Sequence, residues 1–166
     1  PDNQLGKILA TLASAAGGDF NLTETLDASI NSGDIIMLNS IQATDLTNAS
    51  GAGLWVYVGD QPSRSPCDGE EDTTCGKHLD GLTSFSIASN SPRDALIVGK
   101  VAGGKFTGGP GTVRLDLPLV DGAPLVLNLV GAQAELSVSA DGITSARLGG
   151  AITQEALHND VLPALR

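Results

Sequence analysis

The two cysteines are the residues whose spacing points most directly to chemistry. Cys67 and Cys75 enclose seven residues of a short polar segment, a spacing that does not match the C-x-x-C pairs of zinc or thioredoxin-like sites. Only His78 and His158 remain to complete a metal set, so we expect a local disulfide, which implies an oxidising compartment. The alternative is two unpaired thiols in a solvated loop.

Four carboxylates lie within the same loop and are the candidate cation-binding residues: Asp68, Glu70, Glu71 and Asp72. They offer enough oxygen ligands for calcium. The segment nevertheless lacks the Asp-x-Asp-x-Asp-Gly spacing and the closing bidentate Glu of an EF-hand loop. We therefore favour a solvated acidic hairpin tip over a calcium site, and we expect no other metal and no cofactor.

The histidines are the remaining candidates for acid–base chemistry. His78 lies close to acidic residues and could serve as a general base in a hydrolase whose serine and aspartate come from distant parts of the chain. A surface position in a loop is the simpler interpretation of His78, and His158 is expected on the exposed side of a final helix. The chain contains no Gly-x-Ser-x-Gly motif, and the glycines of segment 103–111 do not match a phosphate-binding loop. We therefore lean against an enzyme.

The composition narrows the classes of partner. Only five residues are aromatic, which argues against a sugar-binding face or a platform for single-stranded nucleic acid, because both depend on exposed rings. The formal net charge of −10 disfavours contact with phosphate backbones. No apolar run approaches the roughly 20 residues of a membrane-spanning helix. The 166 residues suit a single domain.

Helices are expected at both ends of this domain. Apolar residues recur at helical spacing in segment 1–17, and Leu22, Leu26 and Ile30 share one face of a second helix that Gly33 would end. These two helices form a predicted helical hairpin over residues 1–33, lying on a sheet. Thr153 would cap a third helix within residues 150–166.

Residues 34–149 form the predicted β region, which contains the disulfide loop 67–75. Apolar and polar residues alternate there with a period of two, which indicates strands with one buried and one solvated face. Short turns, including Asp141-Gly142, favour antiparallel pairing. The fold class is therefore α+β, mainly β, with an antiparallel sheet of about seven or eight strands. The expected strands are 35–47, 54–59, 82–89, 94–101, 112–119, 125–130, 133–139 and 143–148.

Several segments resemble proteins of one family. They are 108–119, 124–132 and 148–152, together with the acidic two-cysteine loop and the residues 77–81 that follow it. They are similar to uncharacterised envelope or secreted proteins of myxobacteria and related bacteria, which carry lipoprotein or secretion signals. The resemblance implies an extracytoplasmic location, either periplasmic, anchored to the outer membrane or secreted. It implies no activity and no catalytic residues.

These observations favour a non-catalytic extracytoplasmic module that serves binding or assembly at the bacterial cell envelope. Its partner would be a protein or a hydrophobic small molecule, and not a nucleic acid. The runs 35–38 and 125–127 are apolar at successive positions, so a sheet with a second open apolar face could carry a lipid-like ligand. If helices cover those residues, the two runs no longer indicate a site for a lipid-like ligand. The alternative is the secreted hydrolase with a site around His78.

Overall fold

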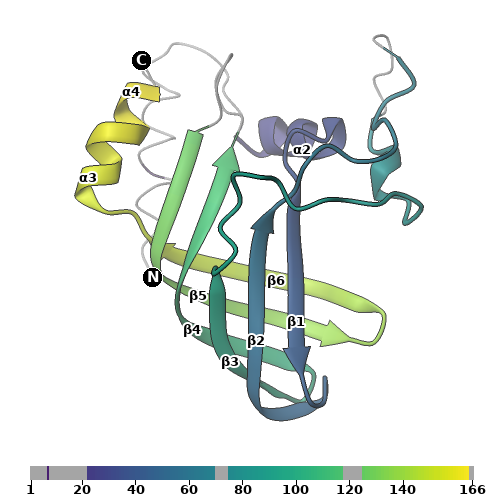
Figure 1. The fold of residues 1–166 in the computed structure, drawn as a ribbon, viewed down its shortest axis with the longest axis vertical. Helices are drawn as coiled ribbons and strands as arrows, with labels where there is room; N and C mark the ends of the chain where they lie inside the picture. Colours follow the sequence, from purple (N-terminus) through teal and green to yellow (C-terminus); the bar gives the residue numbers. More distant parts are fainter. Residues whose placement is uncertain (1–6, 8–21, 70–74, 118–124, 165–166) are drawn as a thin grey trace.

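The chain folds into one curled antiparallel sheet with short helices at its ends (Figure 1). This computed structural model describes residue 7 and residues 22–69, 75–117 and 125–164. Six strands pair in the order of the sequence, from β1 to β6, and every neighbouring pair is antiparallel. In Figure 1 the β5–β6 hairpin crosses behind β1 and β2, so the sheet curls around its own inner face. The predicted class, mainly β and antiparallel, is confirmed.

The strands range in length from seven residues in β1 and β3 to fifteen in β5. Their bounds are Met37–Ala43 for β1, Asn48–Val58 for β2, Leu96–Ala102 for β3, Lys105–Leu117 for β4, Leu125–Ser139 for β5 and Gly142–Ala151 for β6. The turn between β3 and β4 is formed by Gly103 and Gly104, which both have positive φ angles, 59° and 73°. Glycine adopts this conformation without steric cost, which allows a two-residue turn.

The sequence predicted about seven or eight strands, and the sheet has six. One reason is that interruptions in the alternation of apolar and polar residues are bulges within a strand. The register of β4 shifts around Gly111, where the Gly109–Pro110 peptide bond is cis, and the strand then continues. In β5 the segments predicted as 125–130 and 133–139 are one strand that bends near Gly131. A bulge adds a residue to one strand without ending the pairing, so the glycines there did not mark turns.

The predicted strand 82–89 is also wrong. This segment forms one isolated bridge, between Gly59 and Ile87, and a few backbone hydrogen bonds to residues 58–63. The last hairpin has the predicted tight two-residue loop, but Ser139 pairs with Gly142, so the loop residues are Ala140 and Asp141 and not Asp141 and Gly142.

The predicted helices are found in part. The helix α2, Leu22–Ser32, ends at Gly33, whose φ angle is 79°, as the sequence predicts. The first helix of the hairpin falls outside the described residues except for Lys7. In Figure 1, α2 lies beyond one end of β1 and β2 and not across a face of the sheet.

The helix at the C-terminus begins where the sequence predicts. The Thr153 hydroxyl accepts a hydrogen bond from the Ala156 N–H at 3.1 Å, which caps the first turn. The helical segments follow directly as α3 (Gln154–Ala156), the π-helical turn η2 (Leu157–Val161) and α4 (Leu162–Ala164). Pro163 lies inside α4.

The core lies on the inner face of the curl. It is built from aliphatic residues of β2 to β5 around Phe106, which is fully buried. A second, smaller cluster joins the C-terminal helix to the sheet through Val161, Leu125 and Leu127, each at most 1% exposed. The sheet therefore has a packed inner face, and its outer face is left for other contacts.

Candidate functional site

The predicted disulfide is present. Cys67 and Cys75 are bonded across a sequence separation of eight, and there is no free cysteine. The bridge draws the loop against the end of α2, where a Cβ on Gly33 would lie 2.7 Å from Pro66. The loop also leads directly into η1, a short 3-10 helix of residues Lys77–Leu79. The disulfide therefore anchors the irregular segment between β2 and β3.

The candidate cation-binding loop is described only at its first carboxylate. Asp68 forms an ion pair with Lys77, and Glu70, Glu71 and Asp72 lie outside the described residues. Across the part of the chain that is described, no group of three or more His, Cys, Asp or Glu side chains is arranged to hold a metal ion. The solvated acidic tip therefore stays a prediction, with a calcium site as its alternative.

His78 is buried, so its interpretation as a surface residue was wrong. It lies in η1, its side chain is 2% exposed, and its ring meets that of Phe85 edge to face with centroids 6.3 Å apart. Its Nδ1 atom has no hydrogen-bond partner among the described residues. No hydrogen bond described in the structure joins His78 to a serine or an aspartate. The arrangement expected of a Ser–His–Asp set is therefore not formed around His78 by these residues, whereas His158 is exposed as expected.

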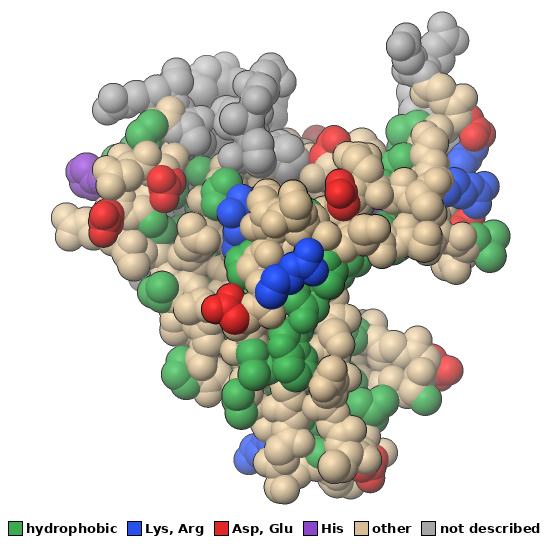
Figure 2. Space-filling view, in the orientation of Figure 1, with side chains coloured by type: hydrophobic (Ala, Val, Ile, Leu, Met, Phe, Trp, Pro, Cys, Tyr) green, Lys and Arg blue, Asp and Glu red, His purple; other side chains and the backbone are tan. Residues whose placement is uncertain are grey.

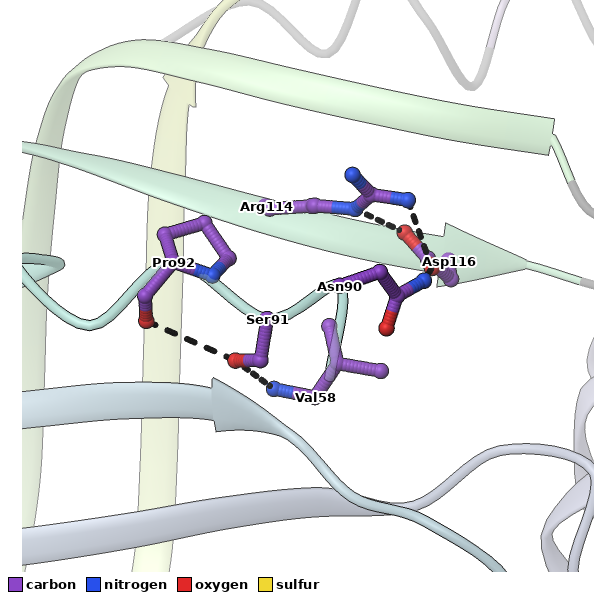
Figure 3. Close-up of polar contacts among 6 residues, drawn as sticks. All are labelled: Val58, Asn90, Ser91, Pro92, Arg114 and Asp116. Atoms are coloured by element: carbon purple, nitrogen blue, oxygen red, sulfur yellow. Dashed lines mark hydrogen bonds and ion pairs between the residues drawn. The ribbon is translucent and has the colours of Figure 1, made fainter. Parts of the chain in front are cut away.

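A polar cluster connects the ends of β2 and β4 (Figure 3). Arg114 donates two hydrogen bonds to the Asp116 carboxylate, at 2.7 and 3.0 Å, and this bond raises the pKa of Arg114. Asn90 donates to the same carboxylate at 3.4 Å. The buried Ser91 hydroxyl accepts from the Val58 N–H at 2.9 Å and donates to the Pro92 carbonyl at 3.4 Å. These contacts hold the loop before β3 between the ends of β2 and β4. A longer β3 would occupy the same position.

The outer face of the sheet carries a group of apolar residues that we call the outer apolar surface: Leu38, Trp55, Tyr57, Leu96 and Val98. The strand register places them on one face, because Leu38 pairs with Tyr57, Trp55 with Leu96, and Gly53 with Val98. Val98 is 63% exposed, and the other four are partly exposed. Figure 2 shows hydrophobic side chains gathered in a strip over β2 and β3 on this face.

A glycine makes room for the aromatic ring in this surface. A Cβ on Gly53 would lie 2.8 Å from Cζ3 of Trp55 and 3.0 Å from Cδ1 of Leu96. The indole and Leu96 therefore occupy the space that a side chain at position 53 would fill. Tryptophan and tyrosine combine a large apolar area with few rotatable bonds, and both are enriched in the centres of protein interfaces.

Charged side chains continue the outer face at the other end of the sheet. Lys105 and Glu135 form an ion pair at 2.9 Å, and the hydrogen bond from Lys105 holds the pKa of Glu135 below its ordinary value. Arg147 is the strand partner of Glu135 on β6 and lowers the same pKa through its charge. The outer face is therefore apolar over β2 and β3 and polar over β5 and β6.

Sequence reasoning missed the outer apolar surface for a definable reason. The alternation in segment 54–59 was recognised, but the opposing residues of β3 could be added only once the register was known. Of the two runs that suggested an open apolar face, residues 35–38 contribute Leu38 to the outer apolar surface. Leu125 and Leu127 are each 1% exposed beneath the C-terminal helix, so residues 125–127 do not supply such a face.

The fold and these sites define a small disulfide-bonded protein built on a six-stranded antiparallel meander with an apolar outer face. Comparisons with protein-family models, with curated proteins and with solved structures found no match. Within the described ranges, no helix is both long enough and apolar enough to cross a membrane.

Proposed function

We propose that the chain is a non-catalytic binding or assembly module that acts outside the reducing cytosol, at the bacterial cell envelope or after secretion. The observation that carries this proposal is the outer apolar surface, where Trp55, Tyr57 and Val98 face solvent together. A contiguous apolar patch on a soluble protein commonly marks a contact site. The extracytoplasmic location is supported by the disulfide, since such bonds persist in oxidising compartments.

A macromolecular partner suits this surface better than an enclosed hydrophobic ligand. Sites for small apolar molecules are concave and bury most of the ligand, whereas Leu38, Trp55 and Val98 lie on the outer side of a sheet. An exposed apolar surface that contains a tryptophan and a tyrosine resembles the centre of a protein interface, where a few aromatic residues contribute most of the binding energy. We therefore propose a protein partner that presents an apolar face of its own.

Site-specific photo-crosslinking tests this proposal in cells that make the protein. A photoreactive amino acid replaces Val98, and a matched variant carries it at Ser50, which is exposed on β2 but outside the outer apolar surface. We expect a defined protein adduct from position 98 that position 50 does not give, and loss of the adduct when Gly53→Ala displaces the indole. Identical adducts from both positions would refute a partner at this surface.

Crosslinking at position 98 also distinguishes a protein partner from a hydrophobic ligand. Trp55 is the only tryptophan, so its fluorescence reports directly on this surface. If oleate or a monomeric detergent at micromolar concentration changed the Trp55 emission and blocked the adduct at position 98, the partner would be a lipid-like molecule. A thiol assay on the protein isolated from the same cells tests the location, because two free thiols would contradict an oxidising compartment.

A further inference from the structure

The strand β6 forms a free edge of the sheet. It pairs with β5 on one side, and no strand of the described chain lies on its other side. Nine of its ten residues are exposed, and Leu148 is the exception. An edge strand presents a row of backbone N–H and C=O groups that no neighbouring strand pairs with, which is a template for the addition of another extended strand.

The sequence of β6 carries little of the protection that free edges usually have. Its only charged residue is Arg147, and it contains no proline, although charges and prolines are the common means of blocking an edge. Register shifts interrupt the ladder at both ends and leave a regular stretch from Ser145 to Gly149. An added strand would therefore pair over about five residues.

The side chains on the two faces of residues 145–149 determine which residue types an added strand would need. Ala146 and Leu148 pair with Leu136 and Ala134, so they continue the inner face of the core, yet Ala146 is exposed. Apolar residues on the incoming strand would cover this row. On the other edge strand, β1, both Ile41 and Ala43 pack against the core, whereas on β6 Leu148 does so and Ala146 does not.

The opposite face of the stretch favours an acidic residue. Arg147 lies beside Glu135 and interacts with it through its charge, but no ion pair joins the two side chains, and the Glu135 carboxylate is bonded to Lys105. An acidic residue on an added strand would give Arg147 a direct partner. A second copy of the chain is a poor source of the strand, since each copy has a net charge of −10 and the two would repel one another. A second copy would also place its own Arg147 at the contact between the two β6 strands.

We propose that β6 is a docking edge for an extended segment of another protein, in which apolar residues alternate with an acidic residue that faces Arg147. Pairing of this kind obtains its affinity from backbone hydrogen bonds and its specificity from alternate side chains. This contact is separate from the outer apolar surface and goes beyond the function proposed above. Either one can be disproved without the other.

The test uses two capped synthetic peptides of sequence Val-Thr-Val-X-Val-Thr-Val, in which X is glutamate or lysine, with the intact oxidised chain. We expect the glutamate peptide to bind about fivefold more tightly, the effect of one cross-strand charge pair, and the Arg147→Gln variant to lose this preference. We expect bound peptide to slow amide hydrogen exchange in residues 145–149 and not in β1.

A matched pair of variants tests the position of the added strand. Ala146→Lys places a charge on the inner row and should weaken binding at least about tenfold, because the ammonium group would be covered by apolar side chains. Ser145→Lys adds the same charge on the other row and should bind nearly as the unchanged chain does. The exchange map does not depend on either variant, so it remains decisive if one of them unfolds.

Several results would overturn the proposal. These are no binding of either peptide at millimolar concentration, exchange protection confined to β1 or the outer apolar surface, and equal weakening by Ala146→Lys and Ser145→Lys. A dimer in sedimentation analysis that Ala146→Lys converts to monomer would show that a second copy occupies the edge, which also contradicts a foreign strand.

Discussion

Two strands approach one another closely where Gly99 of β3 pairs with Gly108 of β4. A Cβ on Gly99 would lie 2.6 Å from the Gly108 Cα and 2.9 Å from Cζ of Phe106, and it would also meet the Thr107 carbonyl oxygen. Two of these three atoms belong to the backbone of the neighbouring strand, which cannot turn aside as a side chain can. We therefore expect Gly99→Ala to destabilise the fold by overpacking.

The size of the destabilisation in Gly99→Ala can be estimated from the kind of contact that the new methyl group makes. Inserting a methyl group into a packed region costs about 1–3 kcal/mol, and a chain of this size loses about 2–4 °C in melting temperature per kcal/mol. The expected loss is therefore about 2–12 °C. The control is Gly149→Ala in β6, where no atom lies within 4 Å of the new Cβ and the φ angle is not positive. That variant should be neutral or more stable by about 0.5 kcal/mol.

Thermal and urea unfolding followed by circular dichroism measure both variants. The comparison within one sheet removes the intrinsic difference between alanine and glycine in a strand. If Gly99→Ala and Gly149→Ala melted at the same temperature, the close approach of β3 and β4 would be incorrect. The curl of the sheet at that point would then need another explanation.

Three further predictions concern the candidate sites. Replacing both Cys67 and Cys75 by serine should lower the free energy of unfolding by about 2.5 kcal/mol on the loop-entropy model, measured by urea denaturation; an unchanged midpoint would contradict it. His78→Leu should leave that free energy equal or higher, because a buried nitrogen without a hydrogen bond costs about 1–3 kcal/mol; a large loss would show that Nδ1 has a partner. The lowered pKa of Glu135 means that its bond to Lys105 stabilises the fold at neutral pH and is lost as the pH falls through the acidic range toward that pKa. The stability difference between the unchanged chain and Glu135→Gln should therefore shrink between pH 7 and pH 3, and a constant difference would refute it.

Local patterns predicted much of the fold because each depends on neighbours in the sequence. The helix that ends at Gly33 follows from a spacing of three and four, and the cap at Thr153 from one hydroxyl beside a helix start. The disulfide between Cys67 and Cys75 follows from two cysteines in one short loop. None of these requires a distant part of the chain to be placed first.

The predictions that failed depended on partners far along the chain. Glycines near positions 109 and 131 produce either a turn or a bulge, and the choice is made by whether the next strand continues to offer hydrogen bonds. Segment 82–89 alternates like a strand but, among the described residues, forms only a few backbone hydrogen bonds, to residues 58–63 at and beyond the end of β2. His78 could not be assigned to the interior from sequence, because its contact with the Phe85 ring depends on how the fold places the segment between β2 and β3.

The sequence by itself determined the antiparallel class, the side of each strand that is apolar, and the bridge that closes the acidic loop, since these properties arise within a few residues of one another. Only the tertiary structure decided which strands are neighbours and in what register. That register brings Trp55 beside Leu96, sets Val98 over Gly53 and leaves β6 without an outer partner. Both proposed contact surfaces arise from pairing across the sheet, which no single stretch of residues encodes.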